Sequence, residues 1–294
     1  MTPAAAHPPG TLGIVAGGGE LPLRVARAAI AAGRPVFAAV IEGWADPAPW
    51  RDLPHIHIRI GATGRILTAF HERDVRQLVL AGAAKRPSLM HMAQGVDAAG
   101  LRLLAKLGRA MFLGDDGFLR GVARVLAEEG FEVVAPQAVL AELLPPAGLL
   151  TEGVPGPDAT ARADIARGIA VCRALGGVDV GQAVVVQQGL VLGVEAIEGT
   201  DALLARCGAL RREGPGGVLV KLAKPGQDRR LDLPGIGPAT AAGAAAAGLR
   251  GIVIEAGGAL LLDRPATLAS AAAAGIFLLA IRPDAFNPDE EISP

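Results

Sequence analysis

The chain has 294 residues, a net charge of −1 and a mean hydropathy of +0.41, which suits one large or two ordinary domains. The near-neutral charge gives no broad basic surface, so we expect no nucleic-acid partner. Hydrophobic residues make up 51% and charged residues 19%, a composition that excludes a disordered chain.

Strands and helices alternate in the first half of the chain. Residues 11–17, TLGIVAG, are a short apolar segment that ends in glycine, and residues 21–33 follow with helical spacing. Further apolar strands are expected at 35–43, 56–60, 75–83 and 131–136, with amphipathic helices among them. This order predicts an α/β fold whose first domain, residues 11–137, is Rossmann-like with a mostly parallel sheet.

Proline and glycine concentrate at residues 144–158, and this change in composition predicts a linker over 138–158. A helix is expected at 159–177, followed by two strands paired around the turn at Gln188 and Gly189. More strands and helices then alternate as far as residue 281. Together these segments predict a second α/β domain over residues 159–284.

Two features bear on location. Residues 266–281 carry no charge, but they are fewer than the roughly 20 residues of a membrane-spanning helix, so we expect a short helix and then a buried strand. The N-terminus lacks the basic and apolar regions of a signal peptide. Cys172 and Cys207 have no zinc-binding spacing and predict buried thiols in a reduced, cytoplasmic protein.

Candidate phosphate-binding residues lie where two strands of the first domain end. The first strand is followed by Gly17, Gly18, Gly19, Glu20 and Leu21, and the fourth by Lys85 and Arg86. Backbone N–H groups and a helix N-terminus favour a phosphate there. A tight turn without a ligand is the alternative. Pro22 stands where the dinucleotide-binding pattern has its third glycine, which argues against a nicotinamide oxidoreductase.

In the second domain, polar residues gather where a strand meets a helix. Glu195, Thr200 and Asp201 are oxygen donors of the kind that Mg²⁺ prefers. Alternatively, Thr200 or Asp201 caps the helix that follows.

The strongest concentration of charge lies at residues 224–240, KPGQDRRLDLPGIGPAT. This segment holds two carboxylates, an amide and three bases, Asp228, Asp232, Gln227, Lys224, Arg229 and Arg230, and a fourth base, Lys221, lies just before it. The bases and the helix start marked by Pro238 favour a phosphate. Carboxylates beside a phosphate are typical of a bridging metal ion or of a base for water. A loop of solvated salt bridges is the alternative.

Five segments occur in an order that resembles one known family. They are GIVAGGGELPLRVA, AAKRPSL, GDDGFLRGVARVLAEEGFEVV, DVGQAVVVQQGLVLGVEAIEGTDALL and KLAKPGQDRRLDLPGIGPAT. Together they are similar to the LpxI-type UDP-2,3-diacylglucosamine pyrophosphatases of lipid A biosynthesis, from residue 12 to about 283. The family's GxVxRP segment is GAAKRP here, at residues 82–87.

The resemblance implies hydrolysis of UDP-2,3-diacylglucosamine to 2,3-diacylglucosamine 1-phosphate (lipid X) and UMP. It also implies Mg²⁺ as the cofactor, attack of water on the sugar-side phosphorus, and two domains that enclose the substrate, with lipid X held largely by the second. A transient contact with the inner-membrane surface and assembly into a homodimer stay open as possibilities. A second possible function is that of a non-catalytic protein that binds a nucleotide sugar or a lipid.

The residues and the resemblance together define the expected site. Catalysis is expected from Lys221, Lys224, Asp228 and Asp232, and both aspartates are candidate Mg²⁺ ligands, with a slight preference for Asp232 as the nearer to the helix start. Substrate contacts are expected from Gly17, Gly18, Gly19, Glu20, Leu21, Lys85, Arg86, Gln187, Glu195, Thr200, Asp201, Gln227 and Arg229.

Overall fold

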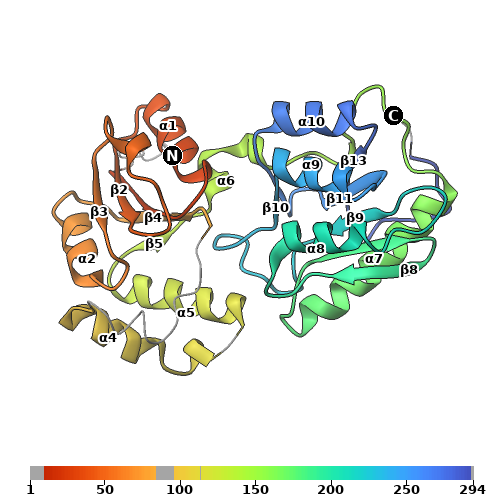
Figure 1. Cartoon of the computed structure of the whole chain (residues 1–294). Helices are drawn as coiled ribbons and strands as arrows, with labels where there is room; N and C mark the ends of the chain where they lie inside the picture. Colours follow the sequence, from red (N-terminus) through yellow and green to blue (C-terminus); the bar gives the residue numbers. More distant parts are fainter. Residues whose placement is uncertain (1–9, 84–95, 113, 293–294) are drawn as a thin grey trace, which may run out of the picture. The chain divides into compact units, whose positions relative to one another are not determined.

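The computed structural model describes residues 10–83, 96–112 and 114–292. The chain divides into two compact units, with the division between Leu140 and Ala141 (Figure 1). A five-stranded sheet forms the centre of the first unit and a six-stranded sheet that of the second. The predicted α/β class, with a Rossmann-like sheet followed by a second α/β unit, is therefore confirmed.

The five strands of the first sheet run parallel. They are β1 (Leu12–Ala16), β2 (Val36–Ile41), β3 (His55–Ile58), β4 (Gln77–Ala81) and β5 (Glu132–Val133). Their order is β3-β2-β1-β4-β5, so β1 is central and the chain first extends the sheet on one side and then on the other. The carboxyl ends of β1 and β4 thus form the switch point at which doubly wound sheets bind ligands.

Helices cover both faces of this sheet. Figure 1 shows α1 (Leu21–Ala31) on the opposite side from α2 (Thr63–His71), α4 (Ala98–Leu107) and α5 (Asp115–Glu128). All six residues of β2 are buried, as expected of a strand covered on both faces. The few aromatic residues are concentrated here: the Phe70 ring packs edge-on at 6.0 Å from Phe37 and 6.1 Å from Phe131. Shorter helices are η1 (Ala48–Trp50), η2 (Gly108–Phe112) and α6 (Pro136–Val139).

The second sheet is mixed. In spatial order its strands are β6 (Gly148–Leu149), β13 (Phe277–Ile281), β11 (Gly251–Glu255), β9 (Val218–Lys221), β7 (Ala183–Gln187) and β8 (Leu190–Val194). Strands β9, β11 and β13 are parallel, whereas β6, β7 and β8 each run antiparallel to a neighbour. The residues expected to form a linker, 138–158, include β6 and the short helix η3 (Ala141–Leu143).

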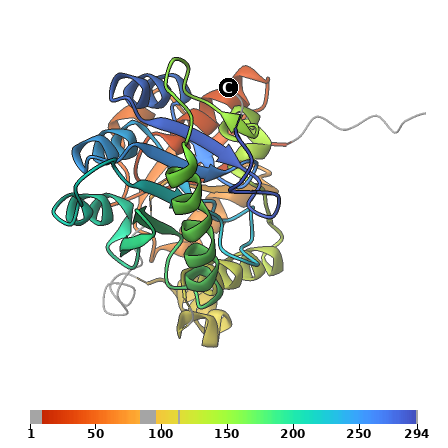
Figure 2. The same ribbon diagram turned by 90° about the vertical axis from the view of Figure 1, so that its right-hand side faces the viewer.

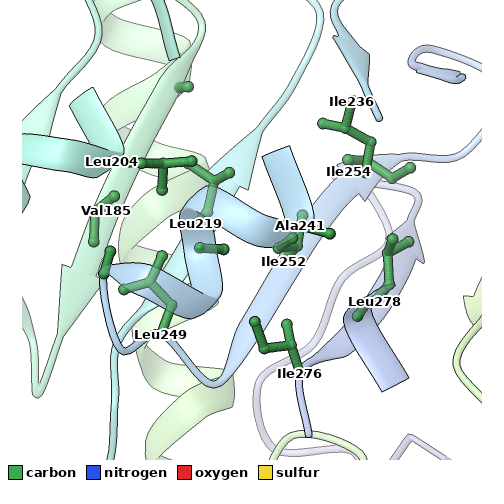
Figure 3. Packing of buried hydrophobic residues seen from close by; sticks show 14 of the residues in the cluster. Val185, Leu204, Leu219, Ile236, Ala241, Leu249, Ile252, Ile254, Ile276 and Leu278 are labelled. Atoms are coloured by element: carbon green, nitrogen blue, oxygen red, sulfur yellow. The ribbon is translucent and has the colours of Figure 1, made fainter. Parts of the chain in front are cut away.

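Helices form a layer on each face of the second sheet. Figure 2 shows α7 (Ala159–Gly177) on one side and α8 (Gly199–Gly208), α9 (Pro238–Ala246) and α10 (Arg264–Ala273) stacked on the other. The strand side chains alternate between two cores. Val184 and Val220 pack with α7, whereas Val185, Leu219 and Ile252 pack with the three stacked helices (Figure 3). A separate parallel pair joins β10 (Gly235–Ile236) to β12 (Leu260–Leu261).

Two predictions of local structure are confirmed, for the uncharged segment and for the cysteines. The uncharged segment forms the end of α10 followed by buried β13. No helix in the described ranges is both long and apolar enough to cross a bilayer. Both cysteines are buried free thiols, and burial raises the pKa of Cys172 to about 12 and that of Cys207 to a smaller degree.

A buried carboxylate holds the predicted hairpin of β7 and β8. Gln188 and Gly189 have φ of 53° and 75°, the two positive values that a type I′ turn needs. Asp164 on α7 is 1% exposed and accepts the N–H of Gln188 at 3.0 Å and that of Gly189 at 2.6 Å. Helix α7 therefore fixes the position of the turn as well as covering the sheet.

Replacing this carboxylate should destabilise the protein. We expect Asp164→Ala to lower the free energy of unfolding by about 2 kcal/mol, because two hydrogen bonds to a charged acceptor are lost. Urea unfolding followed by circular dichroism measures the change. Arg167→Ala, on the exposed side of the same helix, is the control and should change stability by less than about 0.5 kcal/mol. Equal stability of the two variants would contradict the tethering role.

Candidate functional site

Lys221 occupies the carboxyl end of β9, and its side chain is buried, with 7% exposure. Its ammonium donates to Thr200 Oγ1 at 2.7 Å and to the Gly235 carbonyl oxygen at 3.0 Å. Since an ammonium carries three N–H donors, these two bonds fix its orientation and leave one donor without a partner among the described residues. Fully buried lysines are rare unless they are paired, so this residue is the natural centre of the candidate site.

Thr200 and Glu195 extend the contacts of Lys221. The Thr200 hydroxyl, in the first turn of α8, donates to Glu195 Oε1, and Glu195 Oε2 accepts the N–H of Gln182 at 3.2 Å. The N-cap position of α8 is held by Glu198. The alternative that Thr200 or Asp201 caps this helix is therefore wrong, and the structure brings Thr200 and Glu195 to the predicted catalytic lysine.

Negative charge surrounds the buried ammonium. Burial lowers the pKa of Lys221, and the carboxylates of Glu195, Asp232 and Asp201 act against that shift by favouring the charged form. Three carboxylates thus act on one lysine. Asp201 is exposed in the first turn of α8, where a negative charge also interacts favourably with the helix dipole.

The loop that follows β9 is held by its own side chains. Gln227 is buried; its amide oxygen accepts the N–H of Lys224 at 2.9 Å, and its amide nitrogen donates to Asp232 Oδ2 at 3.3 Å. The Lys224 ammonium pairs with Asp179 at 2.6 Å. Gln227 therefore links the start of the charged loop to Asp232.

The arginines of the loop also have carboxylate partners. Arg229 pairs with Glu255, the last residue of β11, at 2.6 Å. Arg230 contacts both oxygens of Asp228, at 3.0 and 2.7 Å. The alternative of a salt-bridged loop thus describes Lys224, Arg229 and Arg230 well. Lys221 differs, because its hydrogen bonds go to neutral oxygens, of Thr200 and Gly235, while the nearby carboxylates act on it electrostatically.

Gln187 is placed away from the Lys221 group. Strand β7 runs antiparallel to β9, with Ala183 opposite Lys221, so Gln187 lies four residues further along, roughly 13 Å away at the other end of the strands. Its fully buried amide donates to the carbonyl oxygens of Arg212 and Pro215 and accepts the N–H of Arg212. These bonds give Gln187 a structural role in holding the loop between α8 and β9.

The glycine-rich segment lies at the switch point of the first sheet. The N–H groups of Gly17 and Gly18 donate to the carbonyl oxygens of Ala81 and Ala83, both at 2.8 Å. A Cβ on Gly17 would lie 2.6 Å from the Ala83 oxygen, so glycine is needed for this close approach. The first two N–H groups are thereby engaged within the fold and do not form the expected phosphate cradle.

The remaining part of that segment keeps the features of an anion site. Gly19 has φ of 84° and turns the chain into α1, whose N-cap is Glu20 and whose first residue is Leu21. The Glu20 side chain makes no capping hydrogen bond, so among the described residues the N–H groups of Leu21 and Leu23 have no side-chain cap and can bind water or a ligand, whereas Pro22 has no N–H. Lys85 and Arg86, predicted to act beside this turn, lie outside the described residues.

The carboxylates of the second unit fit Mg²⁺ only in part. Among the described residues, no three or more His, Cys, Asp or Glu side chains group as a ready metal site. Mg²⁺, however, is usually held by one or two carboxylates together with phosphate oxygens and water. Asp232, whose charge acts on Lys221, has the chemistry to be one of those carboxylates.

Three residues of the site were not predicted from the sequence. Asp179 and Glu255 are the carboxylate partners of the charged loop, and Gln182 supports Glu195. Glu255 ends a buried strand, as Lys221 does, and the rule that strand ends share one sheet edge would have found it. Asp179 has no such signal, because it lies in a turn and meets Lys224 across 45 residues.

Comparison with known proteins identifies relatives along nearly the whole chain. Residues 11–143 match the family model described as the LpxI N-terminal domain, and residues 146–279 match that of the LpxI C-terminal domain. The chain is also similar to a Caulobacter vibrioides protein named UDP-2,3-diacylglucosamine pyrophosphatase LpxI. The two are 41% identical over 278 residues, which cover 92% of this chain and 98% of the relative.

The structural role of Gln187 can be tested directly. We expect Gln187→Ala to lower the free energy of unfolding by about 2 kcal/mol, because the backbone groups it binds lose their partners. The matched control is Gln188→Ala at the neighbouring, exposed position, which should cost less than about 1 kcal/mol in urea unfolding. A Gln187→Ala protein of normal stability that loses ligand binding would instead support the predicted substrate contact.

Proposed function

Since the chain belongs to the LpxI family, we propose that it hydrolyses the pyrophosphate bond of UDP-2,3-diacylglucosamine to lipid X and UMP. The observation that carries the proposal is the 41% identity to the Caulobacter pyrophosphatase, which extends over 98% of that protein. Both domains match the family in the expected order, so the similarity supports the complete two-domain enzyme.

The Lys221 ammonium is suited to stabilising the negative charge of a pyrophosphate substrate. A pyrophosphate repels an attacking water molecule, and negative charge must be stabilised as the bond to phosphorus breaks. In our proposal the one N–H of Lys221 that is not bonded to Thr200 or Gly235 donates to a phosphate oxygen. The buried position strengthens this interaction, because less water screens the charge.

We assign the principal acidic role to Asp232. The Asp228 carboxylate is paired with Arg230 through both oxygens, whereas Asp232 contacts Gln227 and acts electrostatically on Lys221. Asp232 would hold Mg²⁺ or orient the attacking water, with Asp228 as a second candidate ligand. When bound, Mg²⁺ would neutralise charge on the phosphate oxygens. Attack at the sugar-side phosphorus is part of the proposal.

The nucleotide end of the substrate suits the first unit. In the proposal, a phosphate oxygen of the UMP moiety accepts hydrogen bonds from backbone N–H groups at the start of α1, next to Glu20 and Leu21. The switch point between β1 and β4 is the usual place for such a ligand. We also propose a cytoplasmic reaction with transient contact at the inner-membrane surface, because a diacylated substrate is amphipathic.

Product analysis tests the reaction. Incubation of the protein with UDP-2,3-diacylglucosamine and Mg²⁺ in ¹⁸O-labelled water should release UMP. Phosphorus NMR should find the label in the phosphate of lipid X, and a chelator should abolish turnover. Label in UMP would refute the proposed site of attack. Substrate binding in calorimetry without any product would favour the non-catalytic binding protein.

Paired aspartate variants test the assignment of roles. Asp232→Asn should lower kcat by about 1,000-fold with substrate binding retained, because a group acting on the transition state is lost. Asp228→Asn should lower kcat by about tenfold or less, since this carboxylate mainly pairs with Arg230. The measurement is the rate of UMP release by each variant, and thermal unfolding checks that each variant is folded. A larger loss in Asp228→Asn would reverse the assignment.

A further inference from the structure

The hydrogen bonds that join Lys221, Thr200 and Glu195 form a chain in which each donor and each acceptor is determined. A carboxylate can only accept, so Thr200 must donate its single hydroxyl proton to Glu195. The Thr200 oxygen can then only accept from Lys221, at 2.7 Å. The charge of Glu195 therefore sets the orientation of the hydroxyl, and the hydroxyl sets that of the ammonium.

From this geometry we propose that Glu195 and Thr200 are positioning residues that act through Lys221 and do not contact the substrate. Together they aim the remaining N–H of Lys221 at the pyrophosphate. The inference rests on the proposed function. It also revises the expectation, drawn from the sequence, that both residues bind the substrate directly.

The polar atoms of both residues are already engaged. Glu195 accepts Thr200 through one oxygen and the Gln182 N–H through the other, and its side chain is buried with 7% exposure. Thr200 is buried with 9% exposure, and its hydroxyl both donates and accepts. A phosphate oxygen, which only accepts hydrogen bonds, could bind Thr200 only by breaking its bond to Glu195, and the Glu195 carboxylate has no proton to donate. Lys221 differs, because its third donor has no partner among the described residues.

The backbone around the pair is also tightly fixed. Gly181 lies so close to the Glu195 carbonyl oxygen that a Cβ could not be accommodated, and the Glu195 N–H donates to Ala183 at 2.8 Å. Gly199 has φ of 80° at the start of α8, immediately before Thr200. Both ends of the Glu195–Thr200 contact are therefore held by rigid backbone, as a positioning role requires.

The charges that face Lys221 support this role. They are Glu195 beside β8, Asp201 on α8 and Asp232 in the loop before β10, while burial lowers the pKa of the ammonium. Asp201 and Asp232 make no hydrogen bond to Lys221 among those described. Glu195 is thus the carboxylate that acts on it through a directed chain of hydrogen bonds.

Kinetics of two Thr200 variants test the proposal. Thr200→Val keeps the shape of the side chain but removes the hydroxyl, and we expect kcat to fall about 100-fold with KM changed less than about threefold, as for a misplaced catalytic group. Thr200→Ser restores the hydroxyl and should recover kcat to within about threefold of wild type. A rise in KM with unchanged kcat would show a substrate contact and overturn the proposal.

A spectroscopic measurement tests the same contact without turnover. The chain has four lysines, Lys85, Lys106, Lys221 and Lys224, so the ammonium signals of ¹⁵N-lysine-labelled protein are few, and Lys221→Arg identifies the signal of interest. We expect a slowly exchanging Lys221 ammonium in the wild type and in Thr200→Ser. It should broaden or disappear in Thr200→Val and in Glu195→Gln.

These readouts separate the two proposals. If the wild-type protein releases no UMP, the proposed function fails, while the ammonium signal still reports whether Glu195 and Thr200 hold Lys221. If turnover occurs but the signal and kcat of Thr200→Val match the wild type, the positioning role is overturned. Circular dichroism and melting temperature establish that each variant is folded. If Glu195→Gln is not folded, Glu195→Asp, which keeps the charge, replaces it.

Discussion

A buried ammonium group needs partners, and the carboxyl end of the second sheet is organised around that requirement. Removing a charge from water costs several kcal/mol unless hydrogen bonds and opposite charges compensate. Lys221 finds its partners on separate elements: Thr200 on α8 and Gly235 on β10, with Glu195 beside β8 behind Thr200. Segments distant in sequence are thereby tied to the end of β9, and the same contacts that stabilise the charge also orient it.

Each unit has its polar groups at the carboxyl edge of a sheet, but the physical basis differs. In the first unit the candidate donors are backbone N–H groups at the start of α1, whereas those of Gly17 and Gly18 are bonded within the fold, and Gly17 is needed because Ala83 approaches so closely. In the second unit charged side chains provide them, and the pairs of Lys224 with Asp179 and of Arg229 with Glu255 hold the loop around Gln227. A pyrophosphate substrate has chemistry suited to both kinds of donor.

Periodicity in the sequence predicted most of the strands and helices, including the turn at Gln188 and Gly189 and the helix that begins at Pro238. Strand β6 was missed, because two residues carry no periodic pattern. Lys221, Glu195 and Thr200 were proposed in two separate segments, and the structure brings them into contact at strand ends and a helix start. The position of Gln187 depends on the antiparallel direction of β7, and a buried strand has the same composition in either direction. Ion-pair partners such as Asp179 depend on tertiary packing and leave no local signal.

The contact between Asp164 and the hairpin turn has a consequence for the exposed edge of the second sheet. Strand β8 is the edge of its sheet and exposes Leu190 and Val191, and an apolar edge strand is a template for pairing with another chain. A slip of one residue would turn every side chain of the strand to the opposite face. Because Asp164 on α7 accepts both N–H groups of the turn, the position of the turn and with it the register of β8 are fixed by a helix on the covered face of the sheet.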